Sequence, residues 1–179
     1  MNISSQVNAL AAYIFQLMML LTPVKEHNYY ESVQATVIRY TTVAATLAGV
    51  MVEQNMPDAE RLKIAAVMVS IGDAESHWNA DVVSCKKGGD HERAWGPWQT
   101  QLPKDKVCAS TKEAARLALG MVKTSLLTCK HLKASDRLSW YTDGRCIADW
   151  KRSQWRMGRA LTYVAQHPLR YELLVTDAE

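Results

Sequence analysis

Apolar residues recur every three or four positions through the first third of the chain, which is the spacing of one face of an α-helix. From Val7 to Leu21 this pattern predicts a helix that ends before Pro23. A second helix is expected from about Glu31 to Gln54, where apolar residues again recur at three and four. Stripes of this kind are typical of a buried core or of a seam between two helices.

A third apolar segment follows Pro57 and predicts the central helix of the fold. Asp58 is the expected N-cap, because its side chain can accept a hydrogen bond from the first turn. Residues Leu62 to Ile71 are apolar nearly all round, as in a helix that is buried on every side. Glu75 follows at the C-terminal end of this helix.

The stretch from Asn79 to Val107 shows neither the helical nor the strand period. A long irregular segment inside a compact domain is usually either disordered or functional. Three tryptophans in or beside it, Trp78, Trp95 and Trp98, favour an ordered and functional loop.

The rest of the chain has helical patterns only. A capping box from Ser110 to Glu113 opens a helix that continues to about residue 127. Further helical segments are expected over residues 139–144 and 153–166, and no alternation typical of β-strands extends beyond a few residues. The sequence therefore predicts an all-α protein.

Length and charge add little to this fold prediction. The 179 residues suit one domain with an appendage. We divide the chain into an N-terminal helical extension over 1–55 and a main domain over 56–179. We expect the extension to pack on the main domain or on a partner. The net charge of +3 suits an anionic polymer such as a bacterial cell wall, although an ordinary solvated surface explains it equally well. It is too small to indicate a nucleic-acid partner.

Four cysteines lie in the second half of the chain, at Cys85, Cys108, Cys129 and Cys146. Their separations fit no zinc site, which needs close Cys or His pairs. Four cysteines allow three sets of two disulfides, or none. We favour Cys85–Cys108 with Cys129–Cys146, since each bridge would clamp one loop-bearing segment. The alternative is four buried or free thiols in a cytosolic protein.

The apolar run from Ala9 to Leu21 does not look like a conventional signal peptide. No Lys or Arg precedes it, and no clear small-residue cleavage site follows it. Gln16 interrupts it, and the run is too short to span a bilayer as a helix. We interpret it as a packed helix, with a partner-binding or membrane-touching segment as the alternative.

Glu75 is the main candidate for chemistry. Cleavage of a glycosidic bond needs an acid that is still protonated near neutral pH. Apolar surroundings favour the neutral form of a carboxyl group, and a glutamate after an apolar helix and near Trp78 fits that need. A glutamate at a helix end is also commonly a solvated surface residue.

The tryptophans and amides that follow offer the groups that a sugar chain requires. Trp95 and Trp98 can pack on the apolar face of a sugar ring, and Gln99 and Gln101 can bond its hydroxyls. The competing interpretation is that the indoles pack the loop onto the helices.

Other reactive side chains are less informative. His77 and His91 lack a third ligand at metal spacing, so we interpret them as surface or loop-bracing residues. No serine nucleophile motif or phosphate-binding glycine loop is present. We expect neither a metal nor a cofactor.

Four segments, taken in order along the chain, resemble a known family. They are A-E-S-H-W-N-A-D, then S-C, then R-A-W-G-P-W-Q, and later L-S-W-Y-T-D-G-R-C. Their order is similar to that of the soluble lytic transglycosylase-like, lysozyme-like superfamily. In that family a Glu-Ser pair ends a helix, a G-x-x-Q loop follows, and an A-Y-N-type motif lies near the end of the domain. The resemblance covers about Asp58 to Gln166 and implies a lysozyme-like helical domain with an N-terminal extension.

The resemblance implies a role for each matching residue. Glu75 matches the catalytic acid and base, and Ser76 matches the serine that fixes the loop. Gln99 is implied to line the cleft, with Gly96 permitting the turn of its loop. The hydroxyl of Tyr141 is implied to reach toward the catalytic carboxyl group.

Other matches are looser. Ser84 is placed as the loop serine that contacts the acetamido group of the substrate. The usual G-L-M-Q has Trp98 in place of methionine, and Thr142 replaces the asparagine after the motif tyrosine. The D-G-R-C ending resembles a cysteine-bearing branch of the fold, which supports the bridge between Cys129 and Cys146.

The implied activity is that of a peptidoglycan lytic transglycosylase. It would cut between N-acetylmuramic acid and N-acetylglucosamine with Glu75 alone and leave a 1,6-anhydro end. A hydrolytic muramidase is the alternative, with Asp81, Asp90 or Glu92 as a second carboxylate. A structural virion component with a secondary wall-binding domain is the non-enzymatic alternative.

The implied partner is the peptidoglycan glycan strand. Other virion or secretion-machine proteins are expected partners of the N-terminal helices. A wall-cutting protein with disulfides and no conventional signal peptide would act in the periplasm or cell wall, carried in a phage virion or released at lysis.

Overall fold

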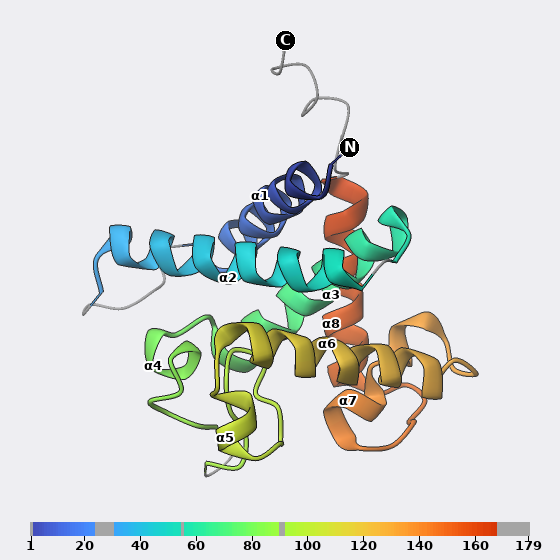
Figure 1. Cartoon of the computed structure of the whole chain (residues 1–179). Coiled ribbons are helices and arrows are strands. Elements are labelled where there is room, and N and C mark those ends of the chain that lie inside the picture. The colour runs from blue at the N-terminus through green and yellow to red at the C-terminus, as the bar shows by residue number, and fades with distance from the viewer. Residues whose placement is uncertain (1, 24–30, 55, 90–91, 168–179) are drawn as a thin grey trace.

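The computed structural model describes residues 2–23, 31–54, 56–89 and 92–167. Within these ranges the chain is helical, and extended pairing is limited to two isolated bridges, Gly89 with Ala94 and Trp95 with Thr100. The prediction of an all-α protein is confirmed. Figure 1 shows the long helices gathered around α3, with the shorter segments below them.

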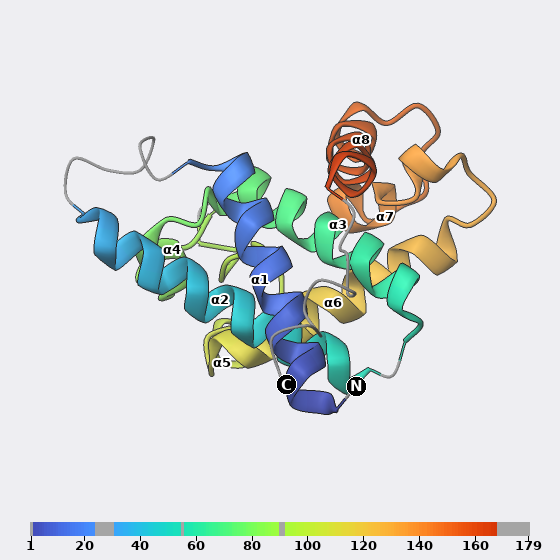
Figure 2. The ribbon, with the colours of Figure 1, turned by 90° about the horizontal axis from the view of Figure 1, so that it is seen from above.

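The first two helices begin one residue after a polar cap. Helix α1 covers Ile3–Leu21, and the side chain of Asn2 accepts a hydrogen bond from the backbone N–H of Ser5. Helix α2 covers Val33–Glu53, and Ser32 caps it in the same way. The predicted pair of helices is confirmed, and α1 packs against α2 in both views of the ribbon (Figure 2).

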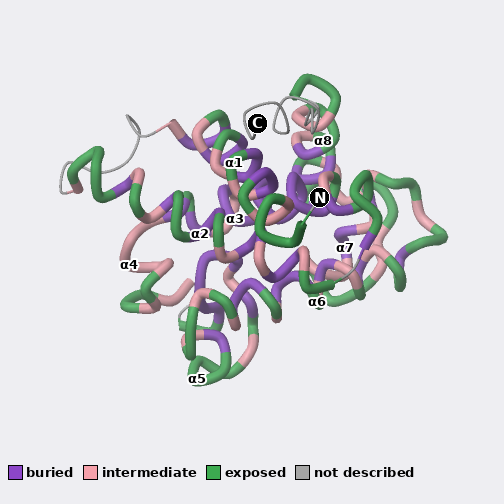
Figure 3. Tube along the Cα trace, turned by 45° about the horizontal axis from the view of Figure 1, so that its top comes forward, coloured by how far each residue is buried: buried purple, intermediate pink, exposed green. Residues whose placement is uncertain are grey.

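Helix α3, Asp58–Ser76, is the centre of the fold. It packs against α1, α2, α6 and α8, which explains why its residues are apolar all round. Asp58 is not the N-cap: Pro57 has that position, and the Asp58 carboxylate pairs with Arg61 at 2.6 Å in the first turn. Figure 3 shows buried positions concentrated along α3 and on the helix faces that meet it.

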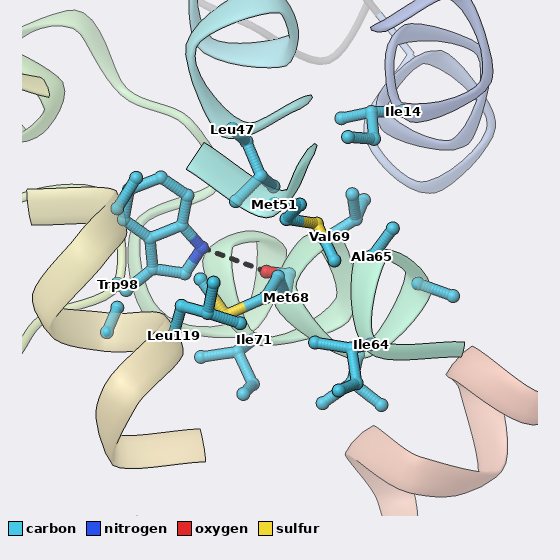
Figure 4. Packing of buried hydrophobic residues seen from close by; sticks show 14 of the residues in the cluster. Ile14, Leu47, Met51, Ile64, Ala65, Met68, Val69, Ile71, Trp98 and Leu119 are labelled. Atoms are coloured by element: carbon cyan, nitrogen blue, oxygen red, sulfur yellow. Dashed lines mark hydrogen bonds between the residues drawn. The ribbon is translucent and has the colours of Figure 1, made fainter. Parts of the chain in front are cut away.

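The N-terminal helices share this core rather than forming a separate layer. Figure 4 shows Ile14 of α1 and Leu47 and Met51 of α2 beside the apolar side chains of α3. Buried Asp73 on α3 also joins three elements, since it accepts hydrogen bonds from Thr22, after α1, and from Arg159, on α8. Helices α1 and α2 therefore help to hold the helix that carries Glu75.

Helix α1 is longer than its apolar run, because the polar residues after Asn2 already belong to it. Judged by length and composition alone, α1 and α2 are each long and apolar enough to cross a membrane. The run from Ala9 to Leu21, which was judged too short to span a bilayer, is therefore only part of a longer helix. Each of the two helices also buries part of its surface in the core.

The remaining helices are short apart from α6 and α8. Helix α6, Thr111–Thr128, starts at Ser110, whose hydroxyl accepts from the N–H of Glu113 as the capping box predicts. Helix α8 is Lys151–Gln166. The shorter elements are α4 (Ala80–Val83), α5 (Lys104–Val107), the 3-10 turn η2 (Ala134–Asp136) and α7 (Ser139–Asp143). The segment expected to be irregular thus contains two single-turn helices.

Two disulfides fasten the segments between these helices. Cys85 bonds Cys108, which joins the residue just past α4 to the C-terminal end of α5. Cys129 bonds Cys146, which joins the C-terminal end of α6 to the segment after α7. Both favoured pairings are confirmed, and the four thiols of the alternative are not present.

Candidate active site

A cleft of about 830 Å³ opens at the C-terminal end of α3. Its walls come from the loop at residues 94–101, from the segment 140–144 and from the first half of α8. Among the described residues, four charged side chains line it, together with amide and hydroxyl groups. The charged residues are Glu75, Asp143, Arg152 and Arg156.

Glu75 lies in the last turn of α3 and lines this cleft with about a quarter of its side chain exposed (27%). Its Oε1 accepts a hydrogen bond from Arg156 of α8, so the carboxylate is held in an ion pair. The expected surroundings of Glu75 were apolar. The structure instead gives it a buried guanidinium as its closest charged partner.

The chain turns sharply after Glu75, and Ser76 fixes this turn. The Ser76 hydroxyl donates to the carbonyl of Gly72 at 2.8 Å and accepts from the N–H of Trp78 at 3.1 Å. His77 and Trp78 both have positive φ, at 46° and 55°, which ends the helix. The contacts of Ser76 are those of a residue that orients the loop rather than one that reacts.

Gln99 also lines the cleft. Its Nε2 donates to the carbonyl of Gly96 at 2.8 Å, and Gly96 has a φ of 72°, where a side chain would be strained. The Oε1 of Gln99 faces Gly89 so closely that any side chain on Gly89 would displace it. Two glycines therefore determine where the amide of Gln99 lies.

Tyr141 also lines the cleft, but its hydroxyl donates to the backbone carbonyl of Trp98 at 2.7 Å. Burial raises the pKa of Tyr141 well above its ordinary value, and the negative charge of Glu75 acts in the same direction. The hydroxyl consequently stays protonated and able to donate. Tyr141 thus connects α7 to the loop at residues 94–101. The resemblance implied that this hydroxyl reaches toward the Glu75 carboxyl group, whereas its hydrogen bond goes to Trp98.

Trp95 and Trp98 do not line the cleft, although we expected them to contact substrate. Trp98 is 1% exposed, and its Nε1 donates to the carbonyl of Met68 at 3.0 Å (Figure 4). Its ring meets that of Trp78 edge to face. Trp95 is 6% exposed and lies under the ammonium of Lys104. The two indoles pack the loop onto the helices, because burying so large an apolar surface stabilises the fold.

Ser84, Asp81 and Glu92 do not line the cleft. Ser84 is exposed beside the disulfide at Cys85, and its hydroxyl donates to the carbonyl of Asp81 at 3.4 Å. Asp81 pairs with Lys87, and Glu92 is exposed; neither lines the cleft. Asp90 and His91 lie outside the described residues. His77 is 72% exposed, as expected for a surface histidine.

Sequence reasoning missed the charged and aromatic side chains of the cleft other than Glu75 and Tyr141, namely Trp140, Asp143, Arg152 and Arg156. Trp140 supplies the aromatic surface that we had sought in the loop, next to Tyr141 in the chain. Arg152 and Arg156 are four residues apart on one helix, a spacing that could have been noticed. Asp143 is bonded to Arg145 at 2.8 Å.

Within the described ranges, no group of three or more His, Cys, Asp or Glu side chains is arranged to hold a metal ion. The chain matches no protein family, no curated protein and no solved structure closely enough to indicate a relative. Any functional assignment therefore depends on the cleft and on the motifs that led to it.

Removing the hydroxyl of Tyr141 tests how the wall of the cleft is held. In Tyr141→Phe the carbonyl of Trp98 loses its donor, so we expect the free energy of unfolding to fall by about 1–2 kcal/mol. Chemical denaturation measures this change. Tyr163→Phe, a tyrosine outside the cleft on α8, is the control, and an equal effect of both variants would contradict the role given to this hydrogen bond.

Proposed function

We propose that the protein cleaves the glycan strands of peptidoglycan and that Glu75 is its general acid and base. The observation that carries this proposal is that Glu75, Gln99 and Tyr141 line one cleft, although they lie far apart in the sequence. These are the residues on which the resemblance to lytic transglycosylases of the lysozyme-like fold depends. The cleft adds the amide of Gln101 and the ring of Trp140, which suit a sugar chain.

In the proposed reaction, Glu75 first donates a proton to the oxygen of the bond between N-acetylmuramic acid and N-acetylglucosamine. The bond from the muramic C1 to that oxygen breaks, and the N-acetylglucosamine end leaves as an alcohol. The Glu75 carboxylate then removes the proton from the muramic C6 hydroxyl, whose oxygen bonds to C1. The product is a 1,6-anhydro ring, no water is consumed, and Glu75 returns to its protonated form.

This route requires the carboxyl group to be released from Arg156 when it carries the proton, since the ion pair seen here is made by the carboxylate. We propose that a bound sugar chain changes this contact. The backbone carbonyl of Arg152 also accepts from Arg156 at 3.1 Å, which gives the guanidinium a second anchor.

Hydrolysis is the second candidate reaction. It is favoured by the position of Asp143, which lines the same cleft as Glu75. Asp143 is the other carboxylate among the described residues of the cleft wall, whereas Asp81 and Glu92 lie outside it. A retaining or inverting glycosidase needs two carboxyl groups, one of them acting as nucleophile or base. Asp143 is therefore the candidate partner of Glu75 in place of Asp81 and Glu92.

The ends of the cleaved strands distinguish the two reactions. We expect digestion of purified cell walls to leave no new reducing ends, and we expect Asp143→Asn to retain at least about half of the activity, since the anhydro route needs one carboxyl group. A reducing-end assay on both proteins measures this. New reducing ends together with a loss of about 100-fold or more in Asp143→Asn would replace the lytic assignment with hydrolysis.

We also propose that the protein acts at the bacterial cell wall, carried in a phage virion or released at lysis. The two disulfides support an oxidising compartment. A structural virion component remains the non-enzymatic alternative, with α1 and α2 as the surface for neighbouring proteins. Detection of the protein in purified particles, or only in lysates, decides between the two routes.

A further inference from the structure

We propose that Arg152 and Arg156 form a carboxylate-binding subsite on the α8 wall of the cleft, which recognises the acidic substituent of N-acetylmuramic acid. This inference rests on the proposed function and adds to it the residues that determine substrate specificity. N-acetylmuramic acid carries a lactyl group that ends in a carboxylate or in an acidic peptide, and N-acetylglucosamine carries neither. The subsite would therefore separate cell-wall glycan from chitin, which is built of N-acetylglucosamine alone.

The two arginines are placed together by the helix. Positions four apart lie one above the other on the same helix face, and both residues line the cleft. The Nη1 of Arg156 donates to the backbone carbonyl of Arg152 at 3.1 Å, which fixes one guanidinium relative to the other residue. An arginine pair with this spacing suits a planar carboxylate.

Arg152 is available to bind an anionic ligand, because the carboxylates of the described cleft wall pair with other arginines. Of the two carboxylates on the described cleft wall, Glu75 is paired with Arg156, and Asp143 is bonded to Arg145. Arg152 is exposed, and no carboxylate among the described residues forms an ion pair with it. Its guanidinium is thus a cation in the cleft that can pair with the carboxylate of a bound ligand.

The buried side chain of Arg156 also supports a carboxylate-binding subsite. Its side chain is 10% exposed, and its Nε has no hydrogen-bond acceptor among the described residues. A buried guanidinium with an unused donor is costly unless a ligand or water completes its bonding. The first turn of α8 contains no acidic residue and no side-chain cap, which adds positive potential at the same end.

Binding of small sugars tests the subsite without requiring cleavage. We expect the protein to bind N-acetylmuramic acid more tightly than N-acetylglucosamine, as measured by NMR titration. Arg152→Gln should weaken the binding of N-acetylmuramic acid by about tenfold and leave that of N-acetylglucosamine unchanged, because only the former offers a carboxylate. Arg152→Lys keeps the charge and should recover part of the loss.

Lys151→Gln is the matched control, since it removes one positive charge from the neighbouring position of α8, outside the cleft. Equal weakening by Lys151→Gln, equal weakening for both sugars, or no preference in the parent protein would overturn the subsite. Two derivatives of N-acetylmuramic acid show which carboxylate the subsite binds: its methyl ester, and the muramyl dipeptide. If the ester binds weakly and the dipeptide binds well, either the lactyl or the peptide carboxylate suffices for binding.

The proposed subsite and the proposed enzymatic function can fail independently of each other. A protein that prefers N-acetylmuramic acid through Arg152 but never cleaves cell walls would retain the subsite and lose the enzymatic assignment. A protein that cleaves cell walls and chitin oligosaccharides at equal rates, with no effect of Arg152→Gln on KM, would retain the activity and lose the subsite.

Discussion

Replacing Glu75 with glutamine is expected to slow the clearing of a purified cell-wall suspension by at least about 100-fold. Glutamine has nearly the shape of glutamate and can still accept a hydrogen bond from Arg156, but it can neither give nor take the proton. The loss should therefore fall on the chemical step. The decrease in turbidity over time, at equal protein concentration, measures it.

Two controls make this result specific. Glu92→Gln and Asp81→Asn also turn a carboxylate into an amide, but on residues outside the cleft, and both should clear walls at the parent rate. Thermal unfolding of Glu75→Gln checks that the loss is not one of folding, because Arg156 is buried and loses its ion pair. A folded Glu75→Gln protein that clears walls as fast as the parent would favour the structural virion component.

The largest effect on stability is expected from Gly72→Ala. A Cβ at this position would lie 2.5 Å from Cζ2 and 2.6 Å from Cζ3 of Trp78, and closer still to Cη2. Carbon atoms pack at about 3.5–4.0 Å, and the Trp78 ring is fully buried, so either the ring or α3 has to move. We expect the free energy of unfolding to fall by about 3 kcal/mol or more.

Gly120→Ala is the matched control for this change. Gly120 lies within α6, and nothing lies within 4 Å of an added Cβ there, so alanine should stabilise the protein by about 0.4–1 kcal/mol. Chemical denaturation of both variants gives the two changes. A Gly72→Ala protein as stable as the parent would contradict the close packing of Trp78 on α3, and with it the way the turn after Glu75 is held.

Much of the fold was predictable because its patterns are local. The stripe from Val7 to Leu21 and the run before Glu75 each specify a helix through its own apolar face. Ser110 capped its helix as expected, since the capping hydrogen bond spans only three residues. Asp58 was assigned wrongly because a proline directly before a helix can take the cap position itself.

The site was less predictable because its contacts join distant parts of the chain. Arg156 and Glu75 are 81 positions apart in the sequence, and no periodic pattern predicts that they pair. Trp98 illustrates the opposite difficulty: an indole in a polar loop suits either a sugar or the core, and only the packing against Met68 and Trp78 decides for the core. Sequence alone identified the candidate acid but not the charges that surround it.

Mass spectrometry of peptide-free glycan strands incubated with the protein tests the central claim most directly. We predict that the strands become shorter and that the new ends have the mass of 1,6-anhydro-N-acetylmuramic acid, with no shortening by Glu75→Gln. Strands of unchanged length after prolonged incubation with the folded parent protein would contradict the assignment of this cleft as a peptidoglycan-cleaving site.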